Sequence, residues 1–367
     1  MKLKTDKVLL SRFFYLFLLT ISGCVEIFVP TIDLDTSAIV ITGIITDLNP
    51  ALVEIATAVA GYTKEGSIER ISGATVLLFD DQGNQEQLTE IRNGYYEGIS
   101  KGVVGREYHI NVHLPNNDII NSTPQLLKPC PSIDSLALEQ ISYLKSFGAI
   151  TQLHLNGLNL NLYMNRDDTL SRYYKWKIGG TYKRYTAFDF ALAELPCYVT
   201  LPDHFYYALG ESMSDNADLL WKKLKFISAD GIYAFGHSVE VVQYSLTQEA
   251  YDYWKKIEEQ QNNVGSIFDS PPAQITGNLN YVDNQKFPVV GFFEASGVKK
   301  KRIFIRRVDF LVLPENPNQF NTFNIDAQCF LPAPWFTPLD SASAPPFCGD
   351  CSLIKNSTKV KPSYWPE

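Results

Sequence analysis

Short apolar runs separated by turn residues restrict the fold of this chain more than any other feature. Four of them lie in its first third: AIVITGIIT (38–46), LVEIATAVA (52–60), GATVLLFDDQGN (73–84) and REYHINVHL (106–114). They are rich in β-branched residues, and Gly, Asn, Asp or Pro stands between them. Strands at this spacing predict an all-β fold that opens with a β-sandwich over residues 37–123.

A proline-rich stretch divides the chain. PQLLKPCPSIDSL (124–136) holds three prolines, which disfavour both a helix and a central strand. We therefore expect a linker there, followed by a larger β-rich domain over residues 137–367. Within that domain YYKWKI (173–178) and SVEVVQYSL (238–246) have the composition of strands.

One short amphipathic helix is expected in the second domain, over residues 247–261. Thr247 can cap its N-terminus, and Glu249 sits in the first turn, where the helix dipole favours an acid. Four apolar residues recur at helical spacing and share one face: Ala250, Tyr253, Trp254 and Ile257.

The dipeptide Asn156-Gly157 stands between two runs of alternating leucines. Leucines occupy odd positions before it and even positions after it. This change of parity predicts either a two-residue hairpin turn or a bulge at Asn-Gly.

The N-terminus has the layout of a bacterial lipoprotein signal over residues 1–23. Basic residues precede an apolar run of nine residues, Phe13 to Ile21, which is too short to span a membrane. An aliphatic and two small residues then lead to Cys24, as in the motif that directs diacylglycerol onto a cysteine thiol. The alternatives are a chance cysteine after an ordinary signal and a packed N-terminal helix. We expect cleavage before Cys24, lipidation of that residue, and a tether over residues 24–36.

The net charge argues against some partners. The chain carries a formal charge of −8, and removing a leader of +3 leaves −11. Such a chain repels nucleic-acid phosphates, so we expect no nucleic-acid partner. The basic run KKKR (299–302) is interpreted as a solvated turn and an edge strand, where lysines discourage unwanted pairing.

Five cysteines remain besides Cys24, and an exported chain can form disulfides. CGDC (348–351) is interpreted as part of a structural disulfide, within the pair or to another cysteine, and the sequence does not fix the pairing. Redox catalysis is disfavoured because no helix pattern follows the pair, and zinc because a second pair of ligands is lacking nearby. The candidate disulfide residues are Cys197, Cys329, Cys348 and Cys351.

No catalytic set emerges from the sequence. GHSVE (236–240) departs from the hydrolase elbow, because a glutamate replaces the closing glycine and the residues after Ser238 have strand composition. His109 and His113 share one face of a strand but lack a third metal ligand. DDQGN (80–84) lacks the acid that closes a calcium loop and predicts a hairpin turn. We therefore expect no catalytic residue, no cofactor and no metal.

Aromatic residues gather in the second domain, and we expect most of them in its core, with a smaller share on a binding surface. They are Tyr173, Tyr174, Trp176, Tyr182, Tyr185, Phe188, Phe205, Tyr206 and Tyr207.

Several segments in fixed order carry a family resemblance. They are the cysteine motif at Cys24, GIITD (43–47), SGATVLLFDDQGN (72–84), GYYEG (94–98), GREYHINVHL (105–114), IDSL (133–136), the 276–307 segment and CGDCSLIKNSTKVKPSYWPE (348–367). In this order they resemble a Bacteroidota outer-membrane lipoprotein family, domain-of-unknown-function family 4249. Lys355-Asn356 departs from the paired glycines that are common in the family's tail.

The resemblance implies an N-terminal immunoglobulin- or transthyretin-like sandwich, an outer-membrane lipid anchor, and genes that accompany TonB-dependent receptors. It implies no activity, and it leaves open whether the protein faces the periplasm or the cell surface. The expected function is that of a non-enzymatic accessory protein of a TonB-dependent receptor, which it contacts chiefly through the second domain. The alternatives are a free-standing glycan- or peptide-capture lipoprotein and, less favoured, a hydrolase.

Overall fold

The computed structural model describes most of the chain beyond its first 37 residues. The described residues are 38–58, 68–147, 151–165, 171–184, 196–201, 207–211, 219–228, 236–262, 275–283, 289–306, 309, 346 and 350–366. The expected signal (1–23), tether (24–36) and lipidated Cys24 lie outside them, as do Cys329 and Cys348.

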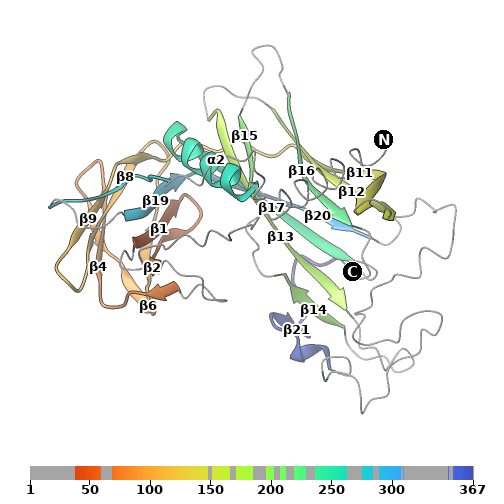
Figure 1. The fold of residues 1–367 in the computed structure, drawn as a ribbon, viewed down its shortest axis with the longest axis horizontal. Coiled ribbons are helices and arrows are strands. Elements are labelled where there is room, and N and C mark those ends of the chain that lie inside the picture. Colours follow the sequence, from red (N-terminus) through yellow and green to blue (C-terminus); the bar gives the residue numbers. More distant parts are fainter. Residues whose placement is uncertain are drawn as a thin grey trace, which may run out of the picture.

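Two six-stranded sheets form the first lobe (Figure 1). Its strands are β1 (Ala38–Thr46), β2 (Pro50–Ala58), β3 (Ile68–Arg70), β4 (Thr75–Asp80), β5 (Gln85–Gln87), β6 (Thr89–Arg92), β7 (Tyr95–Lys101), β8 (Glu107–His113), β9 (Ile119–Ser122), β10 (Gln125–Leu126), β18 (Leu279–Tyr281) and β19 (Val289–Ser296). One sheet has the order β19-β1-β2-β7-β6 with β3 beside β2, and the other has the order β18-β9-β8-β4-β5 with β10 beside β8.

The core of the first lobe follows from the alternation in its strands. Val53 and Ile55 of β2 point inward from one sheet, and Val76, Ile110 and Val112 point inward from the other; all five are fully buried in one cluster. Because alternate residues of a strand face opposite sides, the polar residues between them lie on the outer faces. The sandwich expected over 37–123 therefore forms, with additions from late in the chain.

Two late strands correct the expected domain boundaries. β19 pairs in parallel with β1 over eight residue pairs, from Ile39↔Val289 to Thr46↔Ser296, and β18 pairs with β9. Figure 1 shows β19, coloured by its late position, among the early strands. The segment 37–123 is thus not a complete unit, because one of its sheets is closed by residues from the second half of the chain.

The expected linker over 124–136 is also a packed segment. It contains β10, and Lys128 forms a parallel bridge to Ser296. Leu127, Cys130 and Ile133 are buried. The prolines therefore mark a buried passage between the lobes, not an open connection.

The second lobe is also built from two facing sheets. Its elements are β11 (Ser135–Phe147), β12 (Thr151–Asn165), β13 (Tyr173–Arg184), β14 (Cys197–Thr200), β15 (Tyr207–Glu211), β16 (Leu219–Ser228), β17 (His237–Leu246), β20 (Val298–Ile305), the 3-10 turn η5 (Cys351–Leu353) and β21 (Ser357–Thr358). Three strands form the sheet β11-β12-β16. Six form the other, in the order β20-β17-β13-β14-β21 with β15 beside β13. Leu158, Leu160, Leu162, Trp176 and Val241 fill the space between the sheets.

The helix α2 (Gln248–Asn262) matches the expected one to within a residue. Thr247 accepts the backbone N–H of Ala250 at 3.2 Å, as an N-cap does, a contact that stabilises a helix by about 1 kcal/mol. Ala250 and Tyr253 pack with Leu246 of the second lobe and Phe292 of the first. The helix therefore covers the junction between the lobes. Among the described residues it is the one α-helix, so the all-β class with one short helix is confirmed.

The hairpin expected at Asn156-Gly157 is not formed, because β12 runs straight through it. A Cβ at Gly157 would lie 2.4 Å from the carbonyl oxygen of Ile227 and 2.5 Å from the ring of Phe226. Glycine is required here because β16 approaches closely, and the register shift in this pair lies further along, between Leu160 and Asn161.

Candidate functional site

A buried ion pair joins the two lobes. Lys175 Nζ of β13 lies 2.8 Å from Glu294 Oε2 of β19, and their side chains are 5% and 3% exposed. Trp254 of α2 donates its indole N–H to the same carboxylate at 2.8 Å, and its ring lies 4.1 Å from the Lys175 ammonium. Ser296 donates to the other carboxylate oxygen at 3.1 Å. Burial lowers the pKa of Lys175, while Glu294 opposes that change.

A second set of buried contacts lies beside the passage between the lobes. Trp176 donates its indole N–H to Gln243 Oε1 at 2.7 Å, and Gln243 Nε2 donates to the carbonyl of Pro131 at 2.8 Å. The same amide approaches the sulfur of Cys130, a buried thiol that forms no disulfide. Burial raises the pKa of Cys130 to about 11, so this thiol is inert near neutral pH.

The N-terminus of α2 is tied to the first lobe. Gln125 donates to Glu249 at 2.7 Å and accepts from Thr247 at 2.8 Å. Asp47, in the turn after β1, accepts the backbone N–H of Val298 at 2.8 Å. The contacts at this junction are specific and mostly buried, and their role is to hold the lobes together.

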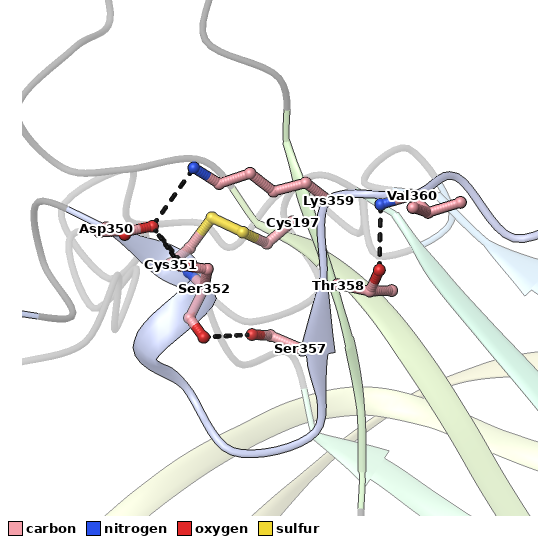
Figure 2. The surroundings of a disulfide bond; sticks show 8 residues. All are labelled: Cys197, Asp350, Cys351, Ser352, Ser357, Thr358, Lys359 and Val360. Carbon is pink, nitrogen blue, oxygen red and sulfur yellow. Dashed lines mark hydrogen bonds and ion pairs between the residues drawn. A yellow bond between two sulfur atoms is a disulfide. The ribbon is translucent and has the colours of Figure 1, made fainter.

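The structure shows how two of the candidate disulfide cysteines are paired. Cys197 of β14 is bonded to Cys351 of η5, across 154 residues of sequence (Figure 2). Asp350 caps this turn by accepting the N–H of Ser352 at 3.0 Å, and Lys359 lies 3.4 Å from the same carboxylate. Asn356 takes a left-handed φ of 62°, which asparagine tolerates, so the departure from glycine in the tail is accommodated.

Aromatic contacts fix the rest of the tail onto the larger sheet. Trp365 packs edge-on against Tyr198 and Phe304, at ring distances of 5.0 and 5.7 Å. The Tyr364 hydroxyl lies 2.9 Å from Thr181 Oγ1, and its ring lies under the Arg302 guanidinium. The C-terminal segment is therefore an integral part of the second lobe.

Other candidates from the sequence take structural positions. Ser238 is fully buried within β17 and accepts a hydrogen bond from Arg302, so the strand reading of GHSVE is confirmed. Beside it, burial and the charge of Lys225 lower the pKa of His237 to about 3. His109 stacks on Phe79 with ring centres 5.1 Å apart.

The residues expected as core include Tyr174, Trp176 and Tyr182, which are buried. Tyr185, Phe188, Phe205 and Tyr206 lie outside the described residues.

Two predictions about turns and edges are confirmed. Asp80 accepts the backbone N–H groups of Gln82 and Asn84 at 3.0 and 2.9 Å, which closes the turn at DDQGN. KKKR lies in β20 at one end of its sheet, and Lys299 and Lys300 are exposed.

The first lobe presents a group of exposed apolar side chains at one end. We call Leu48, Ile99, Val103 and Val104 the apolar tip. Gly102 N donates to Thr46 O at 2.8 Å, which brings the loop after β7 beside the turn after β1. Ile99, on the adjoining β7, is 87% exposed, the highest value among the exposed large apolar residues described. β1 is nine residues long, and a strand rises about 3.3 Å per residue. The tip, at its C-terminal end, therefore lies about 30 Å from Ala38, where β1 begins.

The apolar tip is the candidate functional site, and the sequence reasoning missed it. Val103 and Val104 sit in a short stretch between two strands, where the sequence does not show that the turn leaves them exposed. Val103 N is held by the hydroxyl of Tyr108 at 2.8 Å, so the loop is fixed with these side chains outward. Exposed apolar residues on neighbouring segments of a protein surface are typical of interaction sites.

The described residues hold no group of three or more His, Cys, Asp or Glu side chains that could bind a metal ion. Within the same residues, α2 is neither long nor apolar enough to count as a membrane-spanning helix.

Comparison with known protein families gives one match. The model for a domain of unknown function, DUF4249, matches residues 25–302. The chain belongs to the DUF4249 family. No curated protein matches the chain. The match takes in both lobes, including β18 and β19, and ends within β20.

Proposed function

We propose that this DUF4249 protein is a non-enzymatic, lipid-anchored protein of the outer membrane that binds a TonB-dependent receptor. The apolar tip carries the proposal, because exposing Ile99 on β7 and Val103 and Val104 on the loop after it costs solvation free energy unless a partner covers them. The lipoprotein signal and the family resemblance support the compartment and the class of partner.

The partner surface in this proposal differs from the one expected from the sequence. The sequence predicts it on the tyrosine-rich loops of the second domain, where Tyr185 and Tyr206 lie outside the described residues. The tip lies on the first lobe, at the C-terminal end of β1. A receptor bound there would contact a surface that the junction contacts hold rigidly against the second lobe.

Lipidation of Cys24 is tested by changing its thiol. Cys24→Ser should abolish acylation and lower the membrane-bound fraction of the protein, because two or more acyl chains supply a stable anchor. Membrane fractionation and metabolic labelling with palmitate measure this. Wild-type amounts of label in the variant would exclude Cys24 as the anchor.

Receptor binding through the tip is tested by placing charge in it. Ile99→Lys combined with Val103→Lys should lower recovery of the receptor in a detergent pull-down at least tenfold, because an unpaired lysine would have to be buried in the interface. Both side chains are exposed, so the thermal unfolding midpoint should not change.

The matched control is Val360→Lys, an exposed apolar residue of the second lobe. It should leave receptor recovery at the wild-type level. If the tip variant retains the receptor while the control loses it, the interface belongs to the second lobe and the tip assignment is wrong.

A further inference from the structure

The apolar tip adjoins the second lobe. Asp47 precedes Leu48 of the tip, and its carboxylate accepts the backbone N–H of Val298 at 2.8 Å. Val298 begins β20, and the next residue in that strand, Lys299, is exposed. A lysine of the second lobe therefore stands beside the tip, next to a residue that is hydrogen-bonded to the turn carrying Leu48.

Two lysines of the first lobe lie beside the same tip. Lys101 ends β7, within the segment 99–104 that supplies three of the four tip residues, and it is exposed. Lys128 is half-buried and follows Leu127, whose carbonyl accepts the N–H of Gly105 at 2.9 Å, just after that segment. The three lysines thus come from three separate parts of the chain and lie around one surface.

We call Lys101, Lys128 and Lys299 the tip lysines. Among the residues that the structure describes, none of the three forms an ion pair. Asp47 and Glu86, the acids bonded to the segments around the tip, already accept backbone N–H groups. The charge of the tip lysines is therefore available to a partner.

The chemistry of this surface selects a kind of partner. Four aliphatic side chains require apolar side chains to cover them, and unpaired lysine amines attract carboxylates. Glu97, an exposed acid of β7, offsets part of the lysines' charge and leaves the surface positive. We infer that the tip and the tip lysines form one binding surface across both lobes, which takes an acidic segment of the receptor that also carries apolar residues.

An anionic bilayer is a less favoured occupant of this surface. Lysines beside aliphatic side chains also suit a membrane surface, but the chain as a whole carries a formal charge of −8, which anionic lipids repel. A short segment responds mainly to charges within a Debye length, about 8 Å at physiological salt, and so to the tip lysines. The inference rests on the proposed receptor binding and names the part of the receptor that the tip takes.

Charge reversal tests the inference in the full-length protein. Lys101→Glu combined with Lys299→Glu should lower receptor recovery in the detergent pull-down at least tenfold, because the receptor's carboxylates would meet like charges. Raising the salt concentration should weaken recovery by the wild type more than recovery by this variant. Lys223→Glu combined with Lys361→Glu makes the same change in net charge at exposed lysines of the second lobe and should keep the receptor. All four lysines are exposed, so the unfolding midpoints should not change.

Labelled peptides test the chemistry of the partner without the receptor. The mature chain without lipid, residues 25–367, should bind an alternating Asp-Leu peptide at least tenfold more tightly than Lys-Leu or Asp-Ser peptides of equal length. Fluorescence anisotropy measures this binding. The variant with Lys101 and Lys299 reversed should lose the preference for the Asp-Leu peptide.

The two assays separate this inference from the proposed function. Where the wild type recovers the receptor, retention of that receptor by the reversed variant at the wild-type level overturns the inference and leaves receptor binding standing. Where no receptor is recovered, the proposed function fails and the peptides decide. Lysine-dependent binding of the Asp-Leu peptide then supports the surface. Its absence, or lysine-dependent binding to vesicles with anionic lipid instead, overturns it.

Discussion

Replacing Lys175 with methionine is expected to lower the free energy of unfolding by about 3–5 kcal/mol, because Glu294 would remain charged and buried without its partner. The loss reflects an uncompensated charge and not the net contribution of the pair, which is far smaller. Equilibrium unfolding in urea at pH 7 measures it.

A double variant separates these two quantities. Lys175→Met with Glu294→Gln removes both charges and keeps an acceptor for the indole N–H of Trp254 and the hydroxyl of Ser296. It should recover more than half of the loss. Lys299→Met, at an exposed lysine of β20, is the control and should change stability by less than about 0.5 kcal/mol. A double variant as unstable as Lys175→Met would mean that the stabilising role of the pair is not electrostatic.

Removing the disulfide is the second large effect expected. Cys197→Ala should lower the free energy of unfolding by about 2–5 kcal/mol, because the bond closes a loop across 154 residues and so restricts the unfolded chain. The tail that it holds carries Trp365 and Tyr364, so their contacts with the larger sheet should weaken with it.

Equivalence of the two cysteines is the internal check. Cys351→Ala and the double variant should lower the free energy of unfolding by the same amount as Cys197→Ala, since all three remove the same disulfide. Dithiothreitol should destabilise the wild type by the same amount and leave the variants unchanged. Additive losses from the two single substitutions would show that the thiols act separately and that the bond is not formed in solution.

Local signals were enough for some elements. The apolar spacing from Ala250 to Ile257 and the cap at Thr247 identify α2 because a helix is specified by residues within a few positions of one another. The turn at Asp80 follows for the same reason, since its side chain bonds the backbone two and four residues ahead. The alternation of apolar and polar residues was likewise enough to predict the early strands of the first lobe.

Long-range pairing was not visible in the sequence. VVGFFEAS (289–296) has the composition of a buried strand, but no local feature shows that it pairs in parallel with β1, some 250 residues earlier. Gly291 permits this pairing: a Cβ there would lie 1.8 Å from the carbonyl of Ile41, and its φ is 123°. The hairpin predicted at Gly157 was wrong for the same reason. Glycine is needed there because the ring of Phe226 lies close, and not because the chain turns.

The candidate sites depend on the same long-range information. Lys175 and Lys177 stand on either side of Trp176, a pattern typical of a strand with one solvated face. In the structure Lys175 is nevertheless buried and paired with Glu294 of the other lobe. Val103 becomes part of an exposed tip only because the loops at 46 and 102 are hydrogen-bonded.

We propose that this protein binds a TonB-dependent receptor in the outer membrane. The direct test is affinity purification of the full-length, chromosomally tagged protein from detergent-solubilised outer membranes, followed by mass spectrometry. The full chain is required, because a bait ending at residue 135 would lack β18 and β19 and with them part of both sheets of the first lobe. We expect recovery of one TonB-dependent receptor in near-equal amount. Recovery of the bait alone, under conditions that preserve a known lipoprotein–receptor pair, would contradict it.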